Sequence, residues 1–278
     1  LVLRGGAGVR FERAVNGFPG SSLQLAGGRW RLEQLHLVRS AFLRQAEALL
    51  VITGGKAPIV ANCHFTAATN DTRPQALAIR SNSVDSLRID SNQFTAWSHG
   101  LRLLGGMALR FTNNHITQYS GTFLRAQQLM LPTISHNQFR DALLQQSAVL
   151  GIELEEVSGL QLFSNRFSGT LPAPALHLLR PLAVNNLENR IFNNEFNGSW
   201  PQQLTGDASL LRLDARAATG PLNLFVVHNS VRLVGAASSN QRVLLELWGW
   251  RSLSDSLLLA NNVMVAERFS GSVQAAVG

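Results

Sequence analysis

The sequence is poor in several residue types, and each shortage excludes something. Cys63 is the only cysteine, so no internal disulfide framework holds the chain together. Only 15% of the 278 residues are charged while 45% are hydrophobic, which is enough apolar side chain to bury a large core. No stretch reaches the roughly 18 uninterrupted apolar residues of a membrane-spanning helix, and no basic segment followed by an apolar one opens the chain.

Lysine is nearly absent, since Lys56 is the only one among 24 basic side chains, and the formal net charge is +7. The planar guanidinium group of arginine fits carboxylate, sulfate or phosphate better than a point charge does, so this balance favours an acidic partner. A genome whose codon usage prefers arginine would produce the same composition.

Motifs of several functional classes are missing as well. The sequence contains no phosphate-binding loop, no Rossmann glycine pattern and no Gly-x-Ser-x-Gly elbow. The basic residues alternate with leucine and show no aromatic platform for bases, which argues against DNA or RNA binding. The histidines have no metal-ligand spacing.

The sequence does contain a repeat, in which an asparagine is followed two residues later by an apolar residue. Cys63 with Phe65, and Leu35 with Leu37, extend the same frame upstream. The intervals run from about 22 to 35 residues, which suits a coil with loops of variable length. The pairs are Asn92 with Phe94, Asn114 with Ile116, Asn137 with Phe139, Asn165 with Phe167, Asn194 with Phe196, Asn229 with Val231, and Asn262 with Met264.

Within each interval the apolar residues alternate with a period of two, as in residues 100–104 and 151–155. Alternation over four to six residues, bounded by Gly, Asn or Pro, is typical of β-strands. Each repeat therefore predicts a coil of three short strands, which must stack in parallel on its neighbours about 4.8 Å apart. An asparagine at the bend tolerates the left-handed conformation, and one asparagine per coil predicts a buried hydrogen-bonded ladder.

These Asn-x-apolar coils resemble the right-handed parallel β-helix superfamily, the pectate-lyase-like fold, over essentially the whole chain. We expect an all-β chain that forms a single-stranded right-handed parallel β-helix of about nine coils, as one domain over residues 1–278. Because Leu1 to Leu3 already reads as strand, we expect that a leader or an N-terminal cap is missing. The resemblance implies a secreted, carbohydrate-active protein.

A second, narrower resemblance covers only the first coils. Residues 22–39 and 61–65 are similar to the opening coils of the alginate lyase and chondroitinase B group. The catalytic Lys and Arg of that group belong in the middle coils, and this chain has no lysine after Lys56. None of the catalytic residues of that group is carried over, because a fold alone does not fix the chemistry.

Residues of the first strand of each coil alternate between core and surface, so aligning their inward Leu-x-Leu pairs predicts which side chains share an outer face. One outward row reads Gln24, Val51, Ala78, Arg102, Phe123, Glu153, His177, Arg212 and Glu246. The next row, two residues on, reads Ala26, Thr53, Arg80, Leu104, Arg125, Glu155, Leu179, Asp214 and Trp248. The later coils therefore gather charge on this face.

On this face we predict that Glu155, His177 and Asp214 are the catalytic groups of a polysaccharide lyase or glycoside hydrolase. Glu155 and Asp214 lie two coils apart, near the roughly 6.5 to 9.5 Å that separates the carboxylates of inverting glycosidases. In a lyase, His177 or an arginine would remove a proton beside a neutralised uronate carboxylate. The predicted substrate-binding residues are Arg102, Arg125, Glu153, Arg180, Arg212, Glu246 and Trp248. No cofactor is specified, although Glu153, Glu155 and Asp214 could hold a calcium ion through oxygen ligands.

The same residues also fit a cross-strand charge ladder that merely keeps the face solvated. Close pairing of Glu with Arg would favour the ladder, and convergence without pairing would favour a catalytic site. Trp248 and Trp250 either offer sugar-stacking platforms or cap the last coils. Long loops on a rigid scaffold often form binding walls, and residues 66–75, 142–150, 169–175, 199–208 and 235–242 would rim this face.

Two functions remain open from the sequence. The first is a carbohydrate-active enzyme that acts on an acidic polysaccharide. The second is a non-catalytic surface or envelope β-helix, an adhesin or polysaccharide-binding scaffold. Either would be extracellular, on the cell surface or in the periplasm.

Overall fold

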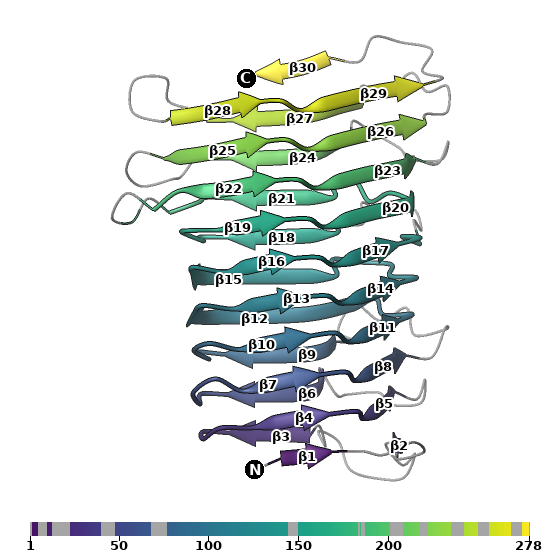
Figure 1. Cartoon of the computed structure of the whole chain (residues 1–278), viewed down its shortest axis with the longest axis vertical. Coiled ribbons are helices and arrows are strands. Elements are labelled where there is room, and N and C mark those ends of the chain that lie inside the picture. Colours follow the sequence, from purple (N-terminus) through teal and green to yellow (C-terminus); the bar gives the residue numbers. More distant parts are fainter. Residues whose placement is uncertain are drawn as a thin grey trace.

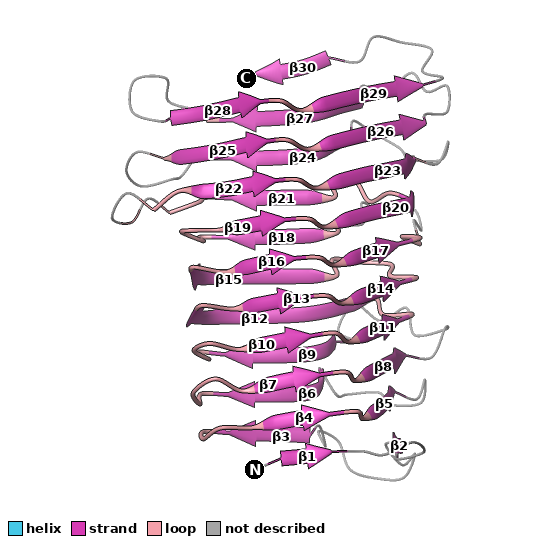
Figure 2. Cartoon of the chain, viewed as in Figure 1, coloured by secondary structure: helices cyan, strands magenta, loops and turns pink. Residues whose placement is uncertain are grey.

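The computed structural model describes residues 2–4, 10–12, 23–39, 48–67, 77–143, 150–182, 184, 187–200, 208–216, 222–234, 242–249, 256–267 and 274–277. The regular structure within these residues is all β-strand, in three parallel sheets of ten strands each (Figure 1). Figure 2 shows the strands stacked coil upon coil into a solenoid. The predicted fold class, a parallel β-helix, is confirmed.

The three sheets take every third strand in chain order. Sheet A contains β1 (Val2–Arg4), β4 (Arg31–Glu33), β7 (Ile59–Ala61), β10 (Arg88–Asp90), β13 (Arg110–Thr112), β16 (Thr133–Ser135), β19 (Gln161–Phe163), β22 (Asn189–Phe192), β25 (Asn223–Val227) and β28 (Ser256–Ala260). Sheet B contains β2 (Arg10–Glu12), β5 (His36–Arg39), β8 (His64–Ala67), β11 (Gln93–Thr95), β14 (His115–Thr117), β17 (Gln138–Arg140), β20 (Arg166–Thr170), β23 (Glu195–Ser199), β26 (Ser230–Val234) and β29 (Val263–Glu267). Sheet C contains β3 (Leu23–Ala26), β6 (Ala48–Thr53), β9 (Leu77–Asn82), β12 (His99–Met107), β15 (Leu124–Met130), β18 (Ile152–Glu155), β21 (Leu176–Leu179), β24 (Ala208–Asp214), β27 (Arg242–Trp248) and β30 (Gln274–Val277).

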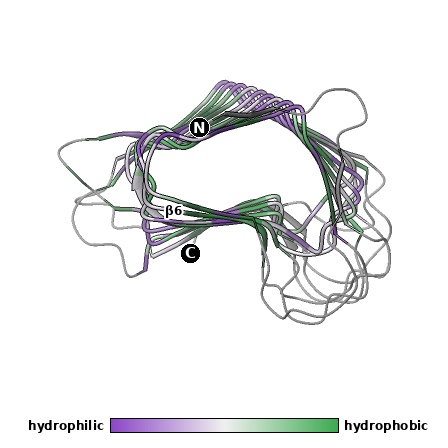
Figure 3. Cartoon of the chain, turned by 90° about the horizontal axis from the view of Figure 1, so that it is seen from below, coloured by the Kyte–Doolittle hydropathy of each residue, from purple (hydrophilic) through white to green (hydrophobic). Residues whose placement is uncertain are grey.

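The coils stack along one axis, so that Figure 3, which looks along this axis, shows them superposed. In Figure 1 the chain runs to the right along the strands of sheet A and returns to the left along those of sheet C while it climbs, which makes the helix right-handed. This is the hand that parallel crossover connections nearly always take. Each sheet has ten strands because one strand lies outside the nine repeat positions: β1 in sheet A and β2 in sheet B precede them, and β30 in sheet C follows them.

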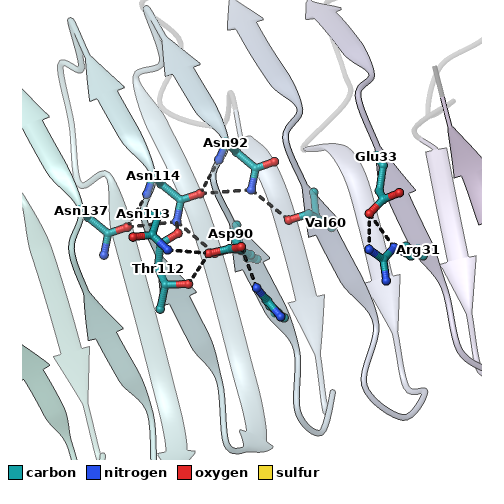
Figure 4. Close-up of polar contacts among 11 residues, drawn as sticks. Arg31, Glu33, Val60, Asp90, Asn92, Thr112, Asn113, Asn114 and Asn137 are labelled. Atoms are coloured by element: carbon teal, nitrogen blue, oxygen red, sulfur yellow. Dashed lines mark hydrogen bonds and ion pairs between the residues drawn. The ribbon is translucent and has the colours of Figure 1, made fainter. Parts of the chain in front are cut away.

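A ladder of buried asparagines joins the coils at the bend between sheets A and B, and Figure 4 shows part of it. The side-chain oxygen of Asn137 accepts hydrogen bonds from the backbone N–H of Asn114, at 2.9 Å, and from its Nδ2, at 3.0 Å. Nδ2 of Asn137 in turn donates to the Phe111 carbonyl at 2.8 Å and to Oδ1 of Asn165 at 2.9 Å. The same pattern runs from Asn92 to Asn262, so the predicted ladder is confirmed.

The left-handed residue at this bend is the one before the ladder asparagine, which differs from the sequence-based expectation. The φ angle is +56° at Asn113 and +58° at His136. This turn aims the next asparagine into the interior, where its amide satisfies backbone groups of the preceding coil and bonds to the asparagine side chain of the following coil. The predicted apolar residue then enters the core, where Phe139 stacks on Phe167 with ring centres 4.5 Å apart, and Phe167 on Phe196 at 4.9 Å.

Candidate functional site

The outer face of sheet C carries the predicted site residues in two rows that the strand register fixes. The first row reads Gln24, Val51, Arg80, Arg102, Arg125, Glu153, His177, Arg212 and Glu246. The second reads Ala26, Thr53, Asn82, Leu104, Gln127, Glu155, Leu179, Asp214 and Trp248. From β18 onward both rows agree with the sequence-based alignment.

The sequence-based alignment was wrong by two residues in β9 and β15. Arg80 and Arg125 belong to the first row, beside Arg102, whereas Ala78 and Phe123 are completely buried. The error has a physical cause: a small residue, Ser81 in β9 and Ala126 in β15, fills the second inward position of these strands. The alignment assumed two large apolar side chains at the inward positions, and in these two strands the second one is small. The correction places three arginines side by side on consecutive strands.

The carboxylate of Glu153 lies between Arg125 and His177. Arg125 Nε is 2.8 Å from Oε1 of Glu153, and His177 Nδ1 is 3.9 Å from Oε2. His177 has the largest effect and, together with Arg125, lowers the pKa of Glu153 below its ordinary value, although burial acts in the opposite direction. Glu153 is therefore an ionised, paired carboxylate at neutral pH.

Glu155, predicted as a catalytic carboxylate, is 7% exposed and surrounded by donors. Arg180 and Gln127 both donate hydrogen bonds to it, and Arg125 Nη2 lies 3.9 Å from its Oε2. Arg180 also lies 3.3 Å from Oε1 of Glu156. The carboxylate of Glu155 is thus held by the neighbouring donor side chains.

Asp214, the second predicted catalytic carboxylate, is 5% exposed and paired with Arg216. Arg216 Nε donates to Oδ1 at 3.0 Å, its Nη2 donates to Oδ2 at 2.6 Å, and its backbone N–H donates to Oδ1 at 3.1 Å. The Arg216 side chain is the main cause that lowers the pKa of Asp214, against the opposing effect of burial. In register, Leu179 separates Asp214 from Glu155, so the two carboxylates are two strands apart, as predicted.

Trp248 is in contact with two guanidinium groups. That of Arg212 lies 5.1 Å from the ring centre and that of Arg216 lies 4.2 Å from it, which are cation–π distances. Arg212 Nε also donates to Glu246 Oε2 at 2.7 Å. Trp248 therefore belongs to the charge network of β24 and β27. Trp250 lies outside the described residues, as do most of the loops expected to rim the face.

These contacts match the charge-ladder interpretation more closely than a converging catalytic centre. Each of the carboxylates at positions 153, 155, 214 and 246 has an arginine partner. Because the pKa values of Glu153 and Asp214 are lowered, neither holds a proton at neutral pH for general acid catalysis. His177 keeps its buried Nε2 without a hydrogen-bond partner in the described structure.

The carboxylates do not gather as calcium ligands. Across the described ranges, no three His, Cys, Asp or Glu side chains lie together as a metal ion would require. Glu153, Glu155 and Asp214 each bind arginine instead. The part of the chain that the structure describes also contains no helix able to cross a membrane.

Arg102 stands apart from these ion pairs. It is exposed on β12, between Arg80 and Arg125, and it makes no ion pair or hydrogen bond with any described residue. Arg125 is 45% exposed although it pairs with Glu153. Arg80 was placed in the wrong row from the sequence. The three arginines form a continuous basic strip on β9, β12 and β15, which we call the arginine row.

Three partners of the predicted site residues were not predicted from the sequence: Gln127, Glu156 and Arg216. Arg216 follows Asp214 by two residues, and this spacing was a usable signal for pairing. A cluster on sheet A, shown in Figure 4, was not predicted either: Thr112 Oγ1 donates to Asp90 Oδ1 at 2.6 Å, and Arg88 Nη2 donates to Asp90 Oδ2 at 2.8 Å. Burial, the largest single effect, raises the pKa of Asp90, but these donors lower it overall.

Comparison with known proteins gave no match to any protein-family model, curated protein or solved structure.

Proposed function

We propose that this chain is a non-catalytic β-helix that binds an acidic polysaccharide along the outer face of sheet C. The observation that carries the proposal is the arginine row, in which exposed Arg102 lies between Arg80 and Arg125 in strand register. Arginine forms paired hydrogen bonds to carboxylate and sulfate groups, and its planar fork is organised in advance for them.

The spacing of the row suits a polymer. Adjacent strands lie about 4.8 Å apart, a distance comparable with the length of one pyranose unit. A chain laid along the solenoid axis would present one acidic group to each arginine in turn. A repeated weak contact of this kind gains from multivalency, because each further contact is intramolecular once the first has formed.

The acidic half of the face has a supporting role in this proposal. The carboxylates of Glu153 and Glu155 form ion pairs with Arg125 and Arg180, so they neutralise part of the charge of these guanidinium groups. Asp214 pairs with Arg216 and Glu246 pairs with Arg212, which neutralises these charges and keeps the outer face of the later coils polar. The predicted substrate-binding residues beyond β18 then act as a structural ladder.

We also propose that the chain belongs to the pectate-lyase-like superfamily, because its coils are parallel and right-handed and an asparagine ladder joins them. A polysaccharide ligand implies a location outside the cytoplasm, on the cell surface, in the periplasm or in the medium. This location can be tested by fractionating the cells that produce the protein.

The experiment that tests the proposal measures the affinity for a polyuronate by calorimetry in wild type and in Arg102→Gln. Loss of one charge-assisted contact should weaken binding roughly tenfold, or about 1.4 kcal/mol. The matched control is Arg110→Gln on sheet A, because Arg110 is also exposed and also has no partner within the described residues. Equal affinities of the two variants would contradict the proposal.

The lyase or glycoside hydrolase that uses Glu155, His177 and Asp214 stays a prediction. Incubation with a panel of uronate polymers would reveal a lyase by the ultraviolet absorbance of its unsaturated product and a hydrolase by new reducing ends. If either signal is present in wild type and absent in His177→Ala and Asp214→Asn with unchanged melting temperatures, the chain is an enzyme. We expect neither signal.

A further inference from the structure

Three exposed apolar side chains gather at one corner of the solenoid, where sheet C turns towards sheet A. Leu104 is 41% exposed, Met107 46% and Leu131 41%. Leu104 and Met107 belong to β12, and Leu131 follows directly after β15. Met107 is in register with Met130, so the three residues form one patch across two adjacent coils. We call it the apolar corner.

The apolar corner is confined to these two coils. At the position of Leu104, the neighbouring coils carry Asn82 in β9 and Gln127 in β15, and at the position of Met130 the next coil carries Ser158. In the coil before that of Met107, the side chain of Asp85 accepts a hydrogen bond from the backbone N–H of Met107. The repeat itself therefore does not require apolar side chains at this corner.

Leu131 is an unusual choice for its backbone conformation. Its φ angle is +54°, in the left-handed region that bulky residues rarely adopt, while the corresponding bends carry Ala57, Ser86 and Ala108 at similar angles. The Leu131 side chain lies against Gly159 of the next coil, and the residue is still 41% exposed. Backbone strain at an exposed apolar residue occurs more often where that residue contacts a ligand.

The apolar corner is continuous with the arginine row. Arg102 and Leu104 are two residues apart on β12, so both side chains point outward from sheet C at a backbone separation of about 7 Å. A ligand unit bound by Arg102 would reach the apolar corner with a substituent on the same sugar ring. The surface thus offers a guanidinium group and an apolar contact side by side.

We propose that the polysaccharide bound by the arginine row is O-acylated, with its acyl esters packed on Leu104, Met107 and Leu131. This inference rests on the proposed function, since the arginine row holds the acidic groups. An ester on a hydroxyl group leaves the carboxylates charged, so the same polymer satisfies both surfaces. A short acyl group suits three side chains on the outside of a turn, whereas long lipid tails favour enclosing pockets.

The experiment compares two forms of one ligand, alginate acetylated on its hydroxyl groups and the same sample after mild alkaline deacetylation. Wild type should bind the acetylated form at least fivefold more tightly. The variant Leu104→Thr/Met107→Gln/Leu131→Ser should bind both forms equally, with its affinity for the deacetylated form unchanged. Leu143→Thr is the matched control, because Leu143 is 42% exposed away from this corner, and it should keep the preference.

Melting temperatures establish that each variant is folded, and Met107→Gln alone should halve the preference if the triple variant is unstable. Equal binding of both forms by wild type, or a preference that survives the triple variant, would overturn the inference and leave the proposed function intact. Binding of neither form would overturn both. A wild-type dimer that the triple variant dissociates would assign the corner to a second copy of the chain and would also overturn the inference.

Discussion

Asn137 illustrates how a single residue type specifies this fold. Its amide accepts from Asn114 and donates to Phe111 and Asn165, so one side chain bonds to backbone and side-chain groups of the two neighbouring coils and joins three consecutive coils. It is completely buried, and its hydrogen bonds therefore replace water fully. The repeat was visible in the sequence because this requirement recurs once in every coil.

Replacing Asn137 by alanine should lower the free energy of unfolding by roughly 3 kcal/mol, since it leaves a buried backbone N–H and the amide of Asn114 unsatisfied. Chemical denaturation checks this value. Gln138→Ala, at the exposed neighbouring position on β17, should change the stability by less than about 0.5 kcal/mol. Similar losses for the two variants would show that the ladder contributes little.

At the scale of elements, the sequence predicted strands, sheets and the later half of sheet C correctly because inward leucine pairs mark the register there. It failed in β9 and β15, where Ser81 and Ala126 replace the large inward side chain. The sequence also did not predict which charged side chains form ion pairs. Register brings Arg125 and Glu153 onto adjacent strands, but only side-chain geometry shows that they pair at 2.8 Å and that Arg102 pairs with no described residue.

The pairing of Arg125 with Glu153 predicts a variant that binds the ligand more tightly than wild type. Glu153→Gln removes the charge that neutralises Arg125, so affinity for a polyuronate should rise about two- to fivefold, by freeing one arginine for the ligand. Calorimetry measures the change, and Glu195→Gln on sheet B is the control because its partner Arg166 lies away from sheet C. A fall in affinity would mean instead that Glu153 itself contacts the ligand.

At the scale of the whole molecule, carboxylates with lowered pKa values link stability to pH. The pKa values of Asp90, Glu153 and Asp214 are lower in the folded chain than their ordinary values. The folded state therefore binds fewer protons than the unfolded state, and the stabilisation is complete above the unfolded pKa of about 4. It is lost as the pH falls through the lower, folded values.

Burial lowers the pKa values of His99 and His115, so the melting temperature should begin to fall slightly as the pH drops below about 6.5. It should fall more steeply below about pH 4, where the three carboxylates take up protons. Scanning calorimetry over this range measures it. Asp214→Asn should show a shallower fall at acidic pH, because one of the three groups no longer titrates. A melting temperature that rises below about pH 4 would contradict the pairing of these carboxylates.

Arginine is exposed on more than one face of the solenoid, as Arg102 on sheet C and Arg110 on sheet A show, whereas the ligand is proposed to bind only at the arginine row of sheet C. The most direct measurement is the rate at which phenylglyoxal modifies individual arginines, read by mass spectrometry with and without a polyuronate. We predict that the polymer slows modification of Arg102 and leaves Arg110 on sheet A unchanged. Equal modification rates of Arg102 with and without polymer, or equal protection of Arg102 and Arg110, would contradict binding at the arginine row.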